Sequence, residues 1–95
     1  MNSIEYIKEI TPDMIVDVTN NDIAKIQIES ITGELKVKAR ISPELEFQDV
    51  VLIDGNYDFV ETAKTAGFYT IDTMGFNAIQ IECSGDIKGF ISGSN

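Results

Sequence analysis

The sequence contains no histidine, and this absence removes much of the common chemistry of enzymes. Without an imidazole, the usual activation of a serine or cysteine nucleophile is missing. No other side chain has an ordinary pKa close enough to neutrality to be the usual general base. Most zinc sites also use histidine. We therefore predict that the protein is not an enzyme and that it uses no metal and no cofactor.

The sequence has a single cysteine, Cys83, so no disulfide can form within the chain. The domain must be stable as a reduced core. Cys83 lies at an inward position of an alternating segment, and we predict that it is reduced and largely buried. No stretch approaches the roughly 18 apolar residues of a membrane-spanning helix. The opening MNSIEYIKEI lacks the basic and apolar regions of a signal peptide, which predicts synthesis in a cytoplasm.

Basic residues are scarce, because seven lysines and arginines stand against 16 aspartates and glutamates and give a net charge of −9. Nucleic-acid phosphates and anionic membrane surfaces would both repel such a chain. We therefore predict no nucleic acid and no membrane as a partner. The excess charge keeps a small protein soluble before assembly. With 95 residues the chain forms one domain, which is too small for a large enclosed substrate cavity.

The sequence is instead rich in hydrophobic alternation with a period of two, which is typical of half-buried strands. The clearest run spans residues 24–41 and is divided at Thr32-Gly33. Each half places apolar residues on one face and polar residues on the other. This pattern predicts two strands joined as a hairpin. The residues expected to face inward are Ala24, Ile26, Ile28, Ser30, Leu35, Val37, Ala39 and Ile41.

A second hairpin is predicted near the end of the chain, with Ser84-Gly85-Asp86 as its turn. Weaker strands are expected at residues 14–18, 47–53, 57–60 and 68–71. About eight short strands in a chain of this length predict an all-β fold. The expected architecture is a small two-sheet antiparallel β-sandwich, jelly-roll or immunoglobulin-like, with an internal hairpin repeat.

The two predicted hairpins are copies of each other. Ile26-Gln27-Ile28-Glu29 recurs as Ile79-Gln80-Ile81-Glu82, and Gly33-Glu34-Leu35-Lys36 recurs as Gly85-Asp86-Ile87-Lys88. Suitable loop lengths place a glutamate opposite a lysine within each hairpin, and opposite charges stabilise an antiparallel pair. We therefore predict the structural pairs Glu29–Lys36 and Glu82–Lys88.

The ends of the chain are the candidate edges for binding a partner. Residues 1–12 are predicted to be an N-terminal arm or edge strand, and residues 13–95 a single sandwich domain. The stretch from Ser3 to Ile10 fits a helix or a strand, and we favour the strand. Unprotected edges invite strand addition or docking. The expected partner contacts are Ile4, Tyr6, Ile7 and Phe90, and deletion of residues 1–10 is expected to release the protein while leaving its core folded.

One turn resembles the opening of a calcium-binding loop. Residues 54–58, Asp-Gly-Asn-Tyr-Asp, have acidic or amide side chains at alternate positions. Phe59 and Thr65 then stand where such a loop needs a glycine and a bidentate acid. A plain turn is the favoured interpretation. Among the aromatic residues only Phe90 falls clearly on an outward face, which offers little for a sugar-binding platform.

The segment TIDTMGFNAIQIE at residues 70–82, followed by Gly85, Ile87 and a Ser/Gly tail, resembles small β-sandwich proteins of tailed-bacteriophage particles. The resemblance covers residues 14–93 and brings no catalytic residue with it. Such domains occur as head decoration proteins, head fibres and tail accessory proteins. The resemblance implies a structural virion protein, made in the host cytoplasm and bound as an auxiliary or decoration protein to other virion proteins. The expected partner is the major capsid protein, with self-association as a further option.

Two other interpretations stay open at this point. One is a tail accessory protein, and the other is a host-surface or carbohydrate-binding module on the same scaffold. An exposed aromatic groove would favour sugar binding. An exposed apolar patch would favour assembly with other proteins.

Overall fold

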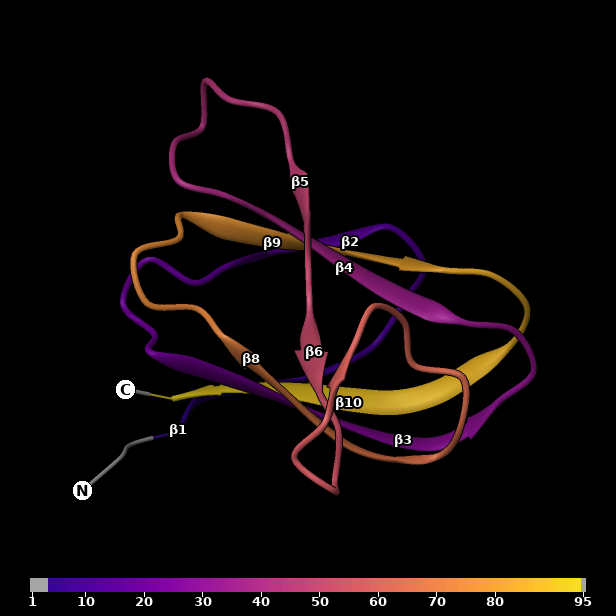
Figure 1. Ribbon diagram of the computed structural model, residues 1–95. Helices are drawn as coiled ribbons and strands as arrows, with labels where there is room; N and C mark the ends of the chain where they lie inside the picture. The colour runs from indigo at the N-terminus through magenta and orange to yellow at the C-terminus, as the bar shows by residue number, and fades with distance from the viewer. Residues whose placement is uncertain (1–3, 95) are drawn as a thin grey trace.

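Within the described residues, ten strands form two antiparallel sheets packed face to face, as the computed structural model in Figure 1 shows. It describes residues 4–94, with side chains from Tyr6 onward. The six-stranded sheet has the order β1 (Ile4–Glu9), β10 (Ile87–Ser94), β3 (Ile23–Ile31), β8 (Gly67–Asp72), β6 (Leu52–Ile53) and β7 (Phe59–Val60). The four-stranded sheet has the order β2 (Met14–Asp17), β9 (Ala78–Cys83), β4 (Leu35–Arg40) and β5 (Gln48–Val50). The predicted all-β sandwich is confirmed.

The core lies between the sheets and is built by the alternation seen in the sequence. Every second residue of the central strands is buried, and each fully buried isoleucine or leucine stabilises the fold by about 1.5–3 kcal/mol. The predicted inward positions are confirmed except for Ser30 and Ile41, which are exposed. β4 ends at Arg40, so Ile41 already lies in the turn that follows it. The buried members of these two strands are Ala24, Ile26, Ile28, Leu35, Val37 and Ala39.

The two predicted hairpins are wrong, because each is an arch that passes from one sheet to the other. β3 lies in the large sheet and pairs with β10, while β4 lies in the small sheet and pairs with β9. An alternating strand buries the same side chains whether the next strand lies beside it or across the core. The pattern therefore fixes which residues face inward but not which sheet they join. Figure 1 shows the two arch connections at the same end of the sandwich.

Four reciprocal hydrogen bonds join the two arch connections, which run from β3 to β4 and from β9 to β10. The N–H of Thr32 donates to the Asp86 carbonyl, and the N–H of Ser84 donates to the Glu34 carbonyl, both at 2.9 Å. In return the hydroxyl oxygens of Thr32 and Ser84 accept from the N–H groups of Asp86 and Glu34, at 2.8 and 3.1 Å. Each bond has a counterpart in the other copy of the repeat. The repeat is therefore a structural symmetry as well as a sequence symmetry.

Glycine is required at the point where the two connections cross. A Cβ atom at Gly33 would lie 2.1 Å from the carbonyl oxygen of Ser84, and one at Gly85 would lie 2.8 Å from the backbone nitrogen of Gly33. Gly85 also has a φ of 72°, which side chains rarely allow. The turn glycine shared by the two copies is thus explained by close backbone approach.

The whole sandwich follows the same pseudo-twofold relation. β3 is flanked by β8 and β10, and its counterpart β9 is flanked by β2 and β4. At the edges, β1 beside β10 corresponds to β5 beside β4. Residues 10–13 join β1 directly to β2, whereas residues 51–66 join β5 to β8 and contain β6 and β7. The β6–β7 hairpin is therefore an insertion that the first copy lacks.

The predicted glutamate–lysine pairs are wrong in their partners, because the copies exchange them. The Lys88 ammonium lies 3.3 Å from the Glu29 carboxylate. Glu82 stands opposite Lys36 across β9 and β4, and its carboxylate is 2.9 Å from the Lys38 ammonium. The expected opposition of charges is present, but it joins strands of different copies.

The N-terminal stretch is a strand, as favoured from the sequence. β1 forms one edge of the large sheet and pairs with β10 from Ile4 opposite Ser94 to Glu9 opposite Phe90. Residues 1–3 and residue 95 lie outside the described residues, together with the side chain of Ile4. Tyr6 packs against the core, and Ile10 is 4% exposed within it. Deleting residues 1–10 would remove both side chains from the core, so we now expect the deletion to destabilise the domain as well as remove the edge strand.

Candidate interaction surface

The outer face of the small sheet is charged and internally paired. Lys38 binds Glu82 at 2.9 Å, and Lys36 lies 3.6 Å from the carboxylate of Asp49. The hydrogen bond that the Lys38 ammonium donates to the Glu82 carboxylate raises the pKa of Lys38. At the end of this face, Arg40 donates to the side chain of Asn77 at 3.2 Å. Such a charged face is stable in contact with water.

The outer face of the large sheet has an ion pair, Glu29–Lys88, near the end of β3, and beside it two rows rich in apolar side chains. One cross-strand row places Gln27 of β3 between Phe90 of β10 and Phe68 of β8. Side chains directly opposite each other share a face, so these three point the same way. A neighbouring row runs over all six strands, and its members are Ile7, Ser92, Lys25, Thr70, Ile53 and Phe59. Five strand spacings make this row about 24 Å long.

The exposure of these apolar side chains is large. Ile7, Phe68 and Phe59 are 65%, 63% and 74% exposed, and Phe90 is 38% exposed. The charged residues of the two rows are Lys25 and, opposite Phe90 at the β1 edge, Glu9. Antiparallel sheets usually keep polar side chains on a solvent face. A contiguous apolar surface on one face indicates a site for binding another molecule. We call the two rows the apolar face.

The apolar face holds a shallow hollow near β1. Its volume is about 210 Å³, and Phe68 and Phe90 border it with Ile7. The polar groups on the floor are Lys25, Gln27 and Ser92. Aromatic rings beside an amide and a hydroxyl can accept either an apolar protein side chain or the ring of a sugar.

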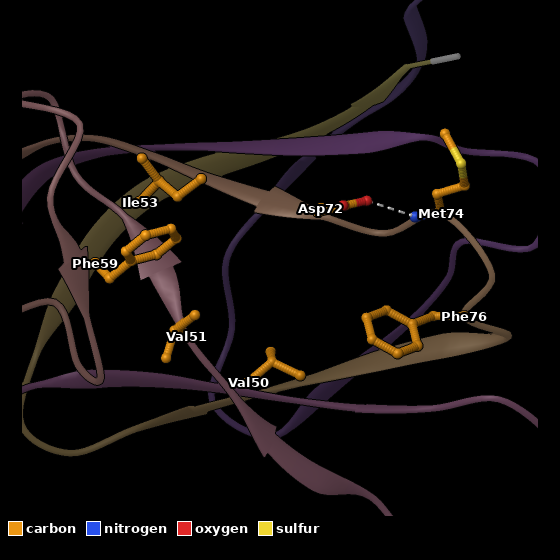
Figure 2. A pocket seen from close by; sticks show the side chains of 7 residues that line it. All are labelled: Val50, Val51, Ile53, Phe59, Asp72, Met74 and Phe76. Atoms are coloured by element: carbon orange, nitrogen blue, oxygen red, sulfur yellow. Dashed lines mark hydrogen bonds between the residues drawn. The ribbon is translucent and has the colours of Figure 1, made fainter.

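A second hollow lies at the opposite end, where the chain crosses between sheets (Figure 2). β5 continues into β6 with only Val51 between them, so the crossing leaves an open flank. The hollow has a volume of about 320 Å³ and is lined by Val50, Val51, Ile53, Phe59, Met74 and Phe76, with Asp72 beside them. Figure 2 shows the ring of Phe76 directed toward Val50 and the ring of Phe59 beside Ile53. We call this the flank hollow.

Asp72 and Met74 form the rim of the flank hollow. The Asp72 carboxylate accepts a hydrogen bond from the Met74 N–H at 3.0 Å, which fixes the loop after β8. An adjoining hollow of about 360 Å³ shares Ile53, Asp72 and Met74 and adds Asp22 to the border. The charged side chains that line these two hollows are both carboxylates. The rim of this apolar region is therefore acidic.

The other residues singled out in the sequence take structural roles. Cys83 is half-buried rather than largely buried, and burial followed by the nearby Asp13 carboxylate raises the pKa of its thiol. The Asp54 carboxylate accepts the N–H groups of Asn56 and Asp58 at 2.9 and 3.0 Å, which is the geometry of a side-chain-stabilised turn. In the described part of the chain, no three acidic or cysteine side chains gather in a way that could hold a metal ion.

The predicted partner contacts are brought together only in part. Ile7 and Phe90 border the shallow hollow on the apolar face. Tyr6 points inward instead, and burial followed by the charge of Asp17 raises the pKa of its hydroxyl to about 12. Sequence reasoning missed Phe68 and Phe59, which are both more exposed than Phe90. A signal was available for Phe68, since it alternates with the buried residues of β8 and shares its parity with Asp72.

Comparison with known proteins shows the fold and not the family. No protein-family model matches the sequence, and no curated protein matches it significantly. The fold is similar to that in the crystal structure of the SPBc2 prophage-derived protein YomS, with a TM-score of 0.72 and 13% sequence identity. That alignment covers 100% of this chain and 92% of the other. Among the residues that the structure describes, no helix is long and apolar enough to cross a membrane.

Proposed function

We propose that the chain is a non-enzymatic structural protein of a tailed-bacteriophage particle, and that it binds another particle protein through the apolar face. The observation that carries the binding role is the contrast between the two outer faces. The small sheet presents paired charges along β4, whereas the large sheet has an ion pair near the end of β3 and otherwise exposes Ile7, Phe68, Phe90 and Phe59. Burying such side chains against a partner is favourable at about 25 cal/mol per Å².

The assignment to a phage particle rests on two supports. The sequence at residues 70–82 resembles small virion proteins, and the fold is similar along the whole chain to that of a prophage-derived protein. Within the particle, we assign the chain as an auxiliary or decoration protein on the capsid, with the major capsid protein as the expected partner. A net charge of −9 suits a role at the outside of the particle rather than against the packaged nucleic acid.

The test is occupancy on purified particles. Particles made by cells that carry the gene are banded in a density gradient, and the protein is quantified by mass spectrometry against the capsid protein. We expect the wild-type protein in a fixed ratio to the capsid protein. Phe68→Ser should lower that ratio about tenfold or more, because it removes a central ring of the apolar face. Absence of the wild-type protein from the particles would overturn the proposal.

A matched control comes from the other sheet. Ile15 on β2 is 54% exposed and lies outside the apolar face. Ile15→Ser removes a similar amount of exposed apolar surface, and it should leave occupancy unchanged. Equal losses for both variants would mean that the large sheet has no special role. Circular dichroism of each purified variant shows whether the sandwich still folds.

A second candidate function is binding of a host-surface carbohydrate, and the shallow hollow is the observation that favours it. Phe68 and Phe90 flank Gln27 there, as rings and hydrogen-bonding groups do in sugar sites. The apolar face extends well beyond this hollow to Phe59, however, and a single sugar ring would not need that length. Binding of the purified protein to a host glycan, lost in Phe68→Ser and without particle occupancy, would move this candidate ahead.

A further inference from the structure

The β6–β7 hairpin is unnecessary for closing the sandwich. The first copy of the repeat connects its equivalent strands through residues 10–13 alone, whereas the second copy inserts this hairpin at the same place. The hairpin adds two short strands to the large sheet and leaves the ring of Phe59 74% exposed. An element that the fold can omit, and that exposes a large apolar side chain, is best explained by recognition.

The hairpin also builds one wall of the flank hollow. Ile53 and Phe59 line it from the hairpin, and Met74 and Phe76 line it from the loop after β8. Its volume of about 320 Å³ is enough for one large aliphatic or aromatic side chain. Phe76 stands at the wall opposite the hairpin in Figure 2, so an inserted side chain would have apolar contacts on two sides.

The charged groups around the flank hollow determine which kind of residue can lie next to a side chain inserted into it. Asp72 and Asp22 border it and its adjoining hollow, and neither is part of an ion pair among the described residues. The lysine on the far side of Val50 and Val51 is Lys36, which Asp49 already holds at 3.6 Å. A positively charged group is therefore the complement of this rim.

We propose that the flank hollow binds a segment of a partner protein in which a large apolar side chain is followed closely by a lysine or arginine. The apolar side chain enters between Phe59 and Phe76, and the cation meets Asp72 and Asp22. This inference rests on the proposed function, because it specifies the partner contact. A second copy of the chain is a poor occupant, since each copy carries a net charge of −9 and would bring further acids to an acidic rim.

The test uses three small peptides and the full-length protein. Acetyl-phenylalanyl-lysine amide carries both features, acetyl-phenylalanyl-glutamate amide reverses the charge, and acetyl-seryl-lysine amide lacks the ring. Binding is followed by NMR through the methyl groups of Ile53 and Met74. We expect the lysine peptide with the ring to bind about five- to tenfold more tightly than the glutamate peptide at low salt. The serine peptide should cause no saturable shift at these methyl groups.

Variants separate the apolar part from the charged part. Phe59→Ser should weaken both phenylalanyl peptides, while Tyr57→Ser, on the same hairpin but outside the hollow lining, should weaken neither. Replacing both Asp72 and Asp22 by asparagine should remove the preference for lysine. Asparagine can still accept the Met74 N–H, so the loop after β8 is retained.

Three results would overturn the inference. Equal affinity for the lysine and glutamate peptides would show that the site does not prefer a cation. NMR shifts confined to the region of Phe68 would show that the peptides do not bind in the flank hollow. Concentration-dependent self-association that is lost in Phe59→Ser would make a second copy the occupant. None of these results bears on particle occupancy, which is measured separately. Failure of this inference is therefore distinguishable from failure of the proposed function.

Discussion

Gly33→Ala is expected to be among the most damaging single substitutions in the chain, although it adds only one methyl group. The new Cβ would lie 2.1 Å from the Ser84 carbonyl oxygen and 2.6 Å from its carbon. Backbone atoms cannot rotate away, so the two arch connections must separate by roughly 1 Å to reach ordinary contact. That movement stretches the four hydrogen bonds that join them, which now measure 2.8–3.1 Å.

The expected loss of folding stability in Gly33→Ala follows from the weakening of those hydrogen bonds. Each contributes about 0.5–1.5 kcal/mol, so weakening most of them costs about 2–4 kcal/mol. Alanine recovers about 0.5–1 kcal/mol by restricting the unfolded chain. The net destabilisation is therefore about 1–3.5 kcal/mol, which for a domain of this size lowers the melting temperature by about 4–28 °C. Urea unfolding followed by circular dichroism measures the free energy directly.

Two comparisons make the measurement decisive. Gly55→Ala is the control, because the nearest atom to its new Cβ is 3.9 Å away, and its stability should stay within about 0.5 kcal/mol of wild type. Gly85→Ala disturbs the same crossing and adds strain from its φ of 72°. The Gly33/Gly85 double variant should lose less than the sum of the two single losses, since both break the same bonds. A Gly33→Ala protein as stable as Gly55→Ala would refute the crossing geometry.

Three further predictions concern side chains. The hydroxyl of Tyr6 is buried and has no hydrogen-bond partner among the described residues, so Tyr6→Phe should leave stability unchanged or raise it by up to about 1 kcal/mol in thermal unfolding. The pKa of Tyr6 is raised to about 12, so the unfolded chain loses this proton at a lower pH than the folded protein. The free energy of unfolding of the wild type should therefore fall by roughly 1 kcal/mol as pH rises from 10 to 12, and that of Tyr6→Phe should not. Burial raises the pKa of the Cys83 thiol, so a thiol reagent at pH 8 should modify the folded protein several-fold more slowly than the urea-denatured chain; equal rates would contradict the half-buried position. A double-mutant cycle should give a coupling of about 0.3–0.5 kcal/mol for Glu29 with Lys88 and none for Glu29 with Lys36, and the reverse result would restore the hairpin register.

The inward-facing residues could be predicted from the sequence, but the sheet to which each strand belongs could not. Alternation is a local property, and it gave the buried positions from Ala24 to Ala39 with one error inside that range. An arch and a hairpin bury the same positions, so the choice depends on contacts between distant strands. Charge pairing could not settle it either. The repeat makes Lys36 and Lys88 equivalent, and each glutamate therefore has two lysines that fit equally well.

The candidate surface was harder to predict than the core. Ile7 and Phe90 were found because both ends of the chain were expected to be sheet edges, where unpaired strands bind. Only β1 is an edge strand, and β10, which carries Phe90, lies between β1 and β3, so the expected C-terminal edge is wrong. Phe59 was missed because it belongs to a two-residue strand, and two residues show no period. The flank hollow depends on the crossing of β5 into β6, which brings Val50 of the small sheet and Ile53 of the large sheet together beside the loop that carries Phe76. No sequence pattern carries that information.

The pairing of strands from different copies of the repeat also determines how the domain must fold. Every strand of the first copy pairs only with strands of the second, as β1 does with β10, β2 with β9, β3 with β8 and β10, and β4 with β5 and β9. The pairings within a copy are those of the inserted hairpin, β6 with β7 and with β8. Neither copy can bury its apolar face alone, so the sandwich gains its stability only when distant halves of the chain meet. Such non-local topologies fold in milliseconds to seconds rather than microseconds. The arch crossing at Gly33 and Gly85 ties both sheets together at one end, and a loss there should therefore reduce the stability of the whole domain in a single cooperative transition.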